Sequence, residues 1–77
     1  MPKFHFHTVL NGIRIIDDEG SDFENLGDAI HEAVLSLREL LANNLKKGRP
    51  IELTLIEIAG EDGLVLMQVP YTMALGT

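Results

Sequence analysis

Side chains alternate along the first part of the chain, as they do on a β-strand. One side of this predicted strand carries Phe4, Phe6, Thr8 and Leu10, and the other carries His5, His7 and Val9. The pair Asn11-Gly12 follows, and it accepts the positive φ angles of a two-residue type I′ turn. The sequence therefore predicts a hairpin over residues 1–17, with Leu10 opposite Ile13, Thr8 opposite Ile15 and His7 opposite Ile16.

The apolar spacing changes to a helical period in the middle of the chain. The apolar positions of this segment are Leu26, Ala29, Ile30, Ala33, Val34, Leu37, Leu40, Leu41 and Leu45. Two helix starts fit a capping box, Ser21 with Glu24 and Asn25 with Asp28, and we favour Asn25. Lys46 and Lys47 suit the negative end of a helix and Gly48 suits its left-handed cap. The pattern predicts a helix over residues 25–47.

A second hairpin is predicted over residues 51–69, because two runs rich in Ile, Leu and Val flank the turn residues 60–63. A four-residue loop would pair Ile58 with Val65, Ile56 with Met67 and Thr54 with Val69. Pro70 marks the end of the hairpin, and residues 71–77 are expected to form a loose tail. Together the elements predict a single α+β domain over residues 1–77: a four-stranded, mostly antiparallel sheet in ββαββ order, with one long helix on one face. The expected strand order is 2-1-3-4.

The predicted sheet has more apolar side chains than one helix can cover. The apolar residues expected on its other face or on the outer side of the helix are Val9, Ile16, Leu35, Leu53, Leu55, Leu64 and Leu66. Scattered leucines on a small protein need no explanation, but a contiguous apolar patch usually marks a contact surface. A chain of 77 residues without cysteine also has few other sources of stability. We therefore expect a homodimer, with these residues as candidates for its interface.

Charge excludes one large class of partners. The net charge of −6 would repel a phosphate backbone, so we expect no nucleic-acid binding. The apolar stretches are too short to span a membrane, and the first residues lack the features of a secretory signal, so we expect no membrane association and a cytoplasmic location.

Reactive side chains are few. His5 and His7 lie on one side of a strand, and Asp18 could approach them as a third metal ligand, although exposed strand histidines are the commoner explanation of such a pair. The acidic run from Asp17 to Glu24 does not have the ligand spacing of a calcium loop. No nucleophile motif or phosphate-binding loop is present. We expect no catalytic residue, no cofactor and no enzymatic activity.

Turn and core positions along nearly the whole chain also carry a resemblance. They are Pro2-Lys3-Phe4, Phe6-His7, Asn11-Gly12, Asp18-Glu19-Gly20, Leu26, Ala29, Ala33, Gly63, Val65 and Val69-Pro70. In these positions the chain resembles a small bacterial domain family of unknown function. Members of that family usually have Asp where this chain has Asn11. The resemblance implies a fold and a bacterial source but no activity, and His7 is the polar position to which it draws attention.

The sequence therefore favours a non-enzymatic protein-interaction module that self-associates and could also bind another protein. One alternative is a small antitoxin-like regulatory domain, because an acidic domain with a hairpin before an amphipathic helix is similar to antitoxins that mask a basic toxin. A weak metal-binding protein using His5 and His7 is the other alternative.

Overall fold

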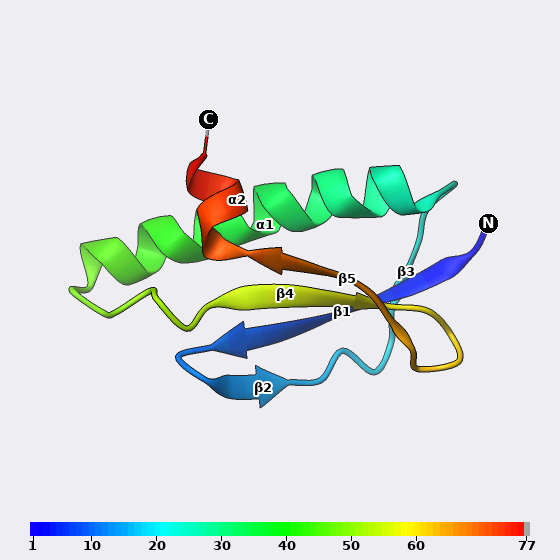
Figure 1. Cartoon of the computed structure of the whole chain (residues 1–77), viewed down its shortest axis with the longest axis horizontal. Helices are drawn as coiled ribbons and strands as arrows, with labels where there is room; N and C mark the ends of the chain where they lie inside the picture. The colour runs from blue at the N-terminus through cyan, green and yellow to red at the C-terminus, as the bar shows by residue number, and fades with distance from the viewer. Residues whose placement is uncertain (77) are drawn as a thin grey trace.

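A computed structural model describes residues 1–76, and it shows an open antiparallel sheet with helices on one face (Figure 1). The strands are β1 (Lys3–Leu10), β2 (Ile13–Ile15), β3 (Ser21–Asp22), β4 (Leu55–Ala59) and β5 (Val65–Pro70), and the helices are α1 (Leu26–Lys46) and α2 (Tyr71–Leu75). The order of the main strands is β2-β1-β4-β5, with every neighbouring pair antiparallel. The predicted α+β class is confirmed. The expected strand order is confirmed too, because the third and fourth predicted strands are β4 and β5.

The first hairpin has the predicted turn. Asn11 and Gly12 have φ angles of 52° and 82°, as a type I′ turn requires, and Leu10 pairs with Ile13. β2 ends at Ile15, so the predicted pairing of His7 with Ile16 is wrong. The chain leaves β1 at this point and returns to pair Ser21–Asp22 of β3 with the start of β1, a short strand that the sequence pattern did not indicate.

Helix α1 begins and ends at the residues that its capping pattern indicated. The Asn25 side chain accepts a hydrogen bond from the Asp28 backbone N–H at 2.9 Å, which satisfies one of the free donors of the first turn. At the other end Gly48 has a φ angle of 69°, and its N–H donates to the Leu45 carbonyl.

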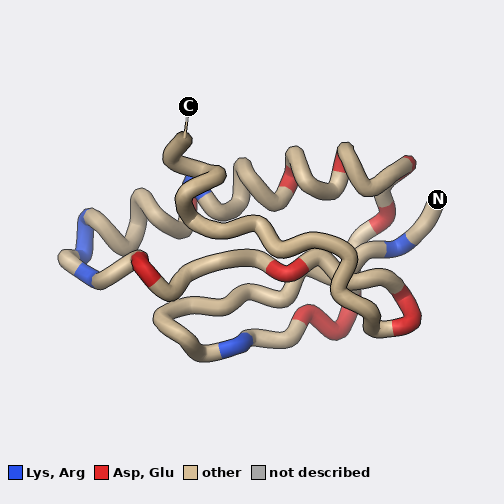
Figure 2. Tube along the Cα trace, viewed as in Figure 1, with Lys and Arg blue, Asp and Glu red and all other residues tan. Residues whose placement is uncertain are grey.

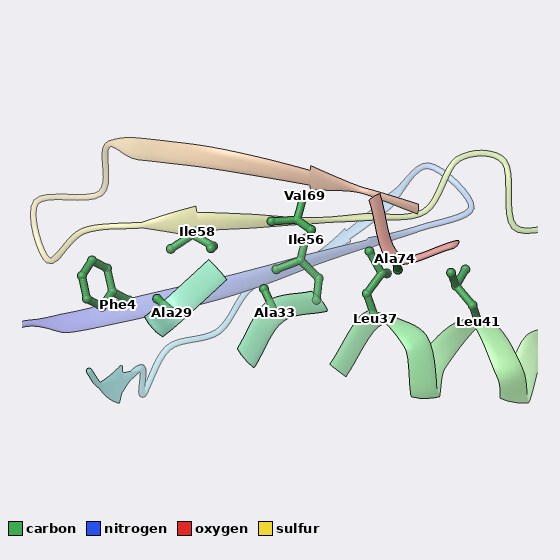
Figure 3. Close-up of a cluster of buried hydrophobic side chains, with 9 residues drawn as sticks. All are labelled: Phe4, Ala29, Ala33, Leu37, Leu41, Ile56, Ile58, Val69 and Ala74. Atoms are coloured by element: carbon green, nitrogen blue, oxygen red, sulfur yellow. The ribbon is translucent and has the colours of Figure 1, made fainter. Parts of the chain in front are cut away.

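The core lies between α1 and the sheet (Figure 3). Small and branched residues of the helix, Ala29, Ala33, Leu37 and Leu41, meet a sheet layer made of Phe4, Ile56, Ile58 and Val69. Alanine at two of the contact positions lets the helix backbone approach β4 and β5, on which it packs. The face of the sheet away from α1 takes no part in this core.

The second hairpin differs from its predicted register. Ile56 pairs with Val69 and Ile58 with Met67, so β5 is shifted by two residues, and a bulge at Ile58/Ala59 brings Ala59 opposite Val65. The cause is a longer turn, in which the Gly60 N–H donates to the Leu64 carbonyl and Leu64 lies in the loop. Since the shift is even, Ile56, Ile58 and Val69 still face the helix. The strand β4 starts at Leu55, because residues 51–54 form a turn instead.

The end of the chain is not a loose tail, which corrects our prediction for residues 71–76; residue 77 lies outside the described part. Residues 71–75 form α2, which packs on α1 and β5 and buries Ala74 in the core. The Tyr71 N–H donates to the Thr54 carbonyl, and Arg38 Nε donates to the Ala74 carbonyl at 3.0 Å. Pro70 ends the strand and is the N-cap residue of this helix.

Candidate functional site

Two features of the fold could carry function: a cluster of polar side chains around Asp17 and the apolar face of the sheet. The polar cluster follows from the alternation of β1, which turns Phe4 and Phe6 to the core and His5 and His7 to the opposite side. The two imidazole rings are stacked with their centroids 6.2 Å apart. His7 is nevertheless buried, with 8% of its surface exposed.

The backbone of Asp17 contacts both imidazoles. His5 Nδ1 lies 2.8 Å from the Asp17 carbonyl oxygen, and since a carbonyl only accepts, this nitrogen must carry the proton. The Asp17 N–H donates to His7 Nδ1 at 3.1 Å, so this nitrogen must be unprotonated. The two histidines therefore have opposite roles towards one peptide segment, and both fasten the chain after β2 to β1.

The side chain of Asp17 completes the same contact. Because β2 ends at Ile15, the Phe6 N–H has no strand partner, and Asp17 Oδ2 accepts its hydrogen bond at 2.9 Å. Asp17 Oδ1 accepts a second bond from the Gly20 N–H at 3.1 Å. Gly20 has a φ angle of 74°, and a Cβ atom there would lie 2.8 Å from Lys3 Cγ, so this tight return of the chain requires glycine.

The pKa of Asp17 reflects these contacts. Burial acts to raise the pKa of the carboxyl, but the backbone hydrogen bonds from Phe6 and Gly20 and the charge of His5 favour the ionised form and outweigh it. The net result is a pKa below the ordinary value for aspartate. The cluster thus contains a carboxylate that is held ionised and saturated with backbone donors.

The hydrogen bonds of this cluster hold the chain after β2 against β1. Among residues 1–76, no group of three or more His, Cys, Asp or Glu side chains could hold a metal ion. The expected third ligand, Asp18, is exposed, and the acidic residue that meets both histidines is Asp17. A signal for Asp17 was present in the sequence, because the register that places Thr8 opposite Ile15 also places Phe6 opposite Asp17.

The apolar face of the sheet is the second feature. We call it the uncovered face, and its predicted members are Val9, Ile16, Leu53, Leu55, Leu64 and Leu66. Leu53 and Leu64 have 64% and 65% of their surface exposed, Ile16 and Leu66 have 49% each, and Val9 and Leu55 are half-buried neighbours on paired strands. Leu35, on the outer side of α1, is also exposed.

A polar row crosses the uncovered face at the middle of the strands. His7, Glu57 and Gln68 are successive partners on β1, β4 and β5. Arg14 of β2 forms an ion pair with Glu57, with Nε and Oε1 2.8 Å apart, and Gln68 Nε2 lies 3.4 Å from Glu57 Oε2. The one carboxylate in this row is therefore partnered, which lowers the cost of covering it.

The structure also exposes two apolar residues that the sequence pattern did not single out. Ile13 and Ile15 of the edge strand β2 are exposed, although their partners Leu10 and Thr8 belong to the strand side that continues from the core. Helix α1 packs on β4 and β5, so β2 extends beyond it. Their exposure could have been predicted, because one helix is too narrow to cover four strands.

Neither feature forms a cavity. No pocket is found in the part of the chain that the structure describes. No helix within residues 1–76 is long and apolar enough to cross a membrane.

Comparison with known proteins identifies a matching family. The sequence profile of one protein family, described as "Domain of unknown function (DUF6894)", matches residues 3–72. No curated protein and no solved structure matches the chain. The match covers the whole sheet and all of helix α1.

Proposed function

We propose that this chain, which belongs to the family DUF6894, a domain of unknown function, is a non-enzymatic protein-interaction module that forms a homodimer. The observation that carries the proposal is the uncovered face, where Leu53, Leu64 and Leu66 are exposed although they lie on or beside a sheet. Exposed apolar side chains favour association, because covering them removes apolar surface from water.

Two further observations support a contact with another protein and not with a small molecule. The described residues form no pocket, whereas small-molecule sites are concave. The polar side chains of the uncovered face are already paired with one another in the row of Arg14, Glu57 and Gln68, so a flat apolar partner can cover them without leaving an unpaired charge. A second copy of the chain offers such a surface.

We place this homodimer in the bacterial cytoplasm. The bacterial source is what the family resemblance implies, and the absence of cysteine fits a reducing compartment. A different protein could also bind the same face in exchange for the second copy. The net charge of −6 argues against nucleic acid as that partner.

The test is the mass in solution, measured by size-exclusion chromatography with light scattering. The wild-type chain is expected to elute as a dimer, and Leu66→Glu, which puts a charge on the uncovered face, is expected to be a monomer. Leu66 is half exposed in one copy, so the substitution leaves the fold of that copy intact.

Two matched variants identify the face. Ile13→Glu changes an exposed apolar residue on the helix side of the sheet and should leave the dimer unchanged. Leu35→Glu tests the outer side of α1 and should also have no effect. A wild-type chain that stays monomeric at millimolar concentration would refute the proposal, and a dimer lost only in Leu35→Glu would move the interface to the helix.

A further inference from the structure

The edge of β1 is interrupted between its two short partners. β2 pairs with β1 up to Ile15, and β3 resumes the pairing at Ser21. Between these points residues 5–7 of β1 lie opposite residues 16–20, so the second segment is longer than the strand it follows. A segment with extra residues bends away from the ladder, as at a β-bulge. We call residues 16–20 the bulge.

Asp17 attaches the bulge to β1. It forms hydrogen bonds with the His5 ring, the Phe6 N–H and the His7 ring. The side chains on both sides of Asp17 are exposed, so the bulge gains little from the burial of apolar surface. A segment with few buried contacts opens more easily than the rest of a fold. The hydrogen bonds of Asp17 therefore decide whether the bulge stays on β1.

The two histidines respond differently to a proton. His5 Nδ1 already donates to the Asp17 carbonyl, so a proton taken up at its Nε2 leaves this contact unchanged. His7 Nδ1 accepts from the Asp17 N–H, so the neutral ring carries its proton on Nε2 and a second proton must go to Nδ1. Both nitrogens of the protonated ring are donors, and no rotation of the ring restores an acceptor. A proton on His7 therefore breaks its contact with Asp17.

We propose that the bulge is a pH switch: it is held on β1 while His7 is neutral and is released when His7 takes up a proton. Histidine is the side chain that ordinarily gains its proton between about pH 5 and 8. The bulge is therefore attached at the upper end of this range and is released as the pH falls. Release takes the acceptor from the Phe6 N–H and separates Ile16, a member of the uncovered face, from β1. This inference does not depend on the homodimer.

Figure 2 shows the charged residues along the chain, and those beside His7 come from β1, β2, β4 and the bulge. The His5 ring is stacked on His7 with the centroids 6.2 Å apart, so two charged rings would repel each other. Glu57 is the β4 partner of His7 and favours a proton on it, but Arg14 holds this carboxylate in an ion pair, with Nε and Oε1 2.8 Å apart. The Asp17 carboxylate also favours positive charge nearby. The other charged residues of the bulge and of this side of β1 are Lys3, Asp18 and Glu19.

These charges set the pH at which the switch acts. Its direction follows from the hydrogen bond alone, because only the neutral His7 ring can accept from the Asp17 N–H.

The experiment follows the ring nitrogens of His7 and the backbone amide of Asp17 by ¹⁵N NMR from about pH 8 to about pH 5. As the ring gains its proton, the protection factor of the Asp17 amide in hydrogen exchange should fall about tenfold, the factor for one hydrogen bond of ordinary net strength. A protection factor is already corrected for the effect of pH on the exchange of a free amide. The Asp17 carboxyl stays ionised over this range, because its pKa lies below the ordinary value for aspartate.

Two matched variants separate the histidines. His7→Asn places a carboxamide oxygen near the position of Nδ1, and this oxygen accepts from the Asp17 N–H at every pH, so the protection factor should no longer change. His5→Asn is the control, because its amide N–H can donate to the Asp17 carbonyl and the dependence on pH should remain. The wild-type titration is repeated in Leu66→Glu, so that a change in association is not mistaken for a change within one copy.

An Asp17 amide that stays protected down to about pH 5 would overturn the switch, whether or not the His7 ring has gained its proton. A dependence on pH that persists in His7→Asn, or one that disappears in His5→Asn, would overturn it as well. Each of these results leaves the homodimer untouched, because the measurement in Leu66→Glu concerns a single copy.

Discussion

Asp17 is the residue on which the end of the first hairpin depends. Its peptide group contacts His5 and His7, and its carboxylate replaces a strand partner for the Phe6 N–H. Residues 17–19 are all acidic and equally able to accept a hydrogen bond, so only the register of the hairpin, which places Phe6 opposite Asp17, distinguishes them. Because β2 leaves β1 at this point, the Asp17 carboxylate is the one used.

Replacing Asp17 by Asn should lower the free energy of unfolding by about 1 kcal/mol at pH 7, because the amide has one oxygen and can accept only one of the two backbone hydrogen bonds, and accepts it less strongly than a carboxylate. We expect a loss at the low end of the cost of a missing buried hydrogen bond, because Asp17 is only half-buried. Urea denaturation of both proteins followed by circular dichroism measures the difference.

The same pair of proteins tests the pKa of Asp17. Because this pKa is lowered by folding, the contribution of the carboxylate is fully present above the ordinary pKa of aspartate and is lost as the pH falls through the lowered value. The difference between wild type and Asp17→Asn should therefore disappear in strongly acidic solution. A difference that is independent of pH would show that the ionised carboxylate is not the stabilising species.

At the scale of elements, local signals decided most boundaries. Asn11-Gly12 has the side chains for its turn, and Asn25 with Asp28 caps α1, and both interactions span four residues or fewer. The register of the second hairpin could not be predicted from local signals. The bulge at Ile58/Ala59 and the hydrogen bond from Gly60 to Leu64 are small differences in backbone conformation that leave the apolar pattern unchanged. A shift of two residues preserves the face of every strand residue before the bulge, so hydrophobic patterning cannot detect it.

Helix α2 gives the clearest test of an element. Ala74 is 5% exposed against the core, so Ala74→Lys would bury a cation beside Arg38 and should reduce the free energy of unfolding by about 2 kcal/mol or more. Met73→Lys is the matched control on the exposed side of the same helix, and it should change stability by less than about 0.5 kcal/mol. Equal effects in thermal denaturation would mean that α2 does not pack on α1 in solution.

At the scale of the whole molecule, a small core and the uncovered face are linked. A chain of 77 residues buries only about 60–65% of the surface that it exposes when unfolded, so an extra interface is a large share of its stability. A homodimer that dissociates on unfolding should have a midpoint temperature that rises with protein concentration. Calorimetry over a hundredfold range of concentration should show this rise for the wild type and not for Leu66→Glu. A midpoint that stays constant in both would contradict the homodimer.

The sequence by itself determined the helix, its caps, the first turn, the class of the fold and the apolar surplus, because these depend on residues that are neighbours along the chain or on a simple period. The tertiary structure alone decided the register of β5, the docking of Tyr71–Leu75 and the meeting of His5 and His7 with Asp17. Each of these depends on a contact between two segments that are distant in the sequence. The side chains involved are compatible with several such contacts. The contacts between the segments select one of them: the Phe6 N–H, for example, is paired only because Asp17 comes close enough to accept its hydrogen bond.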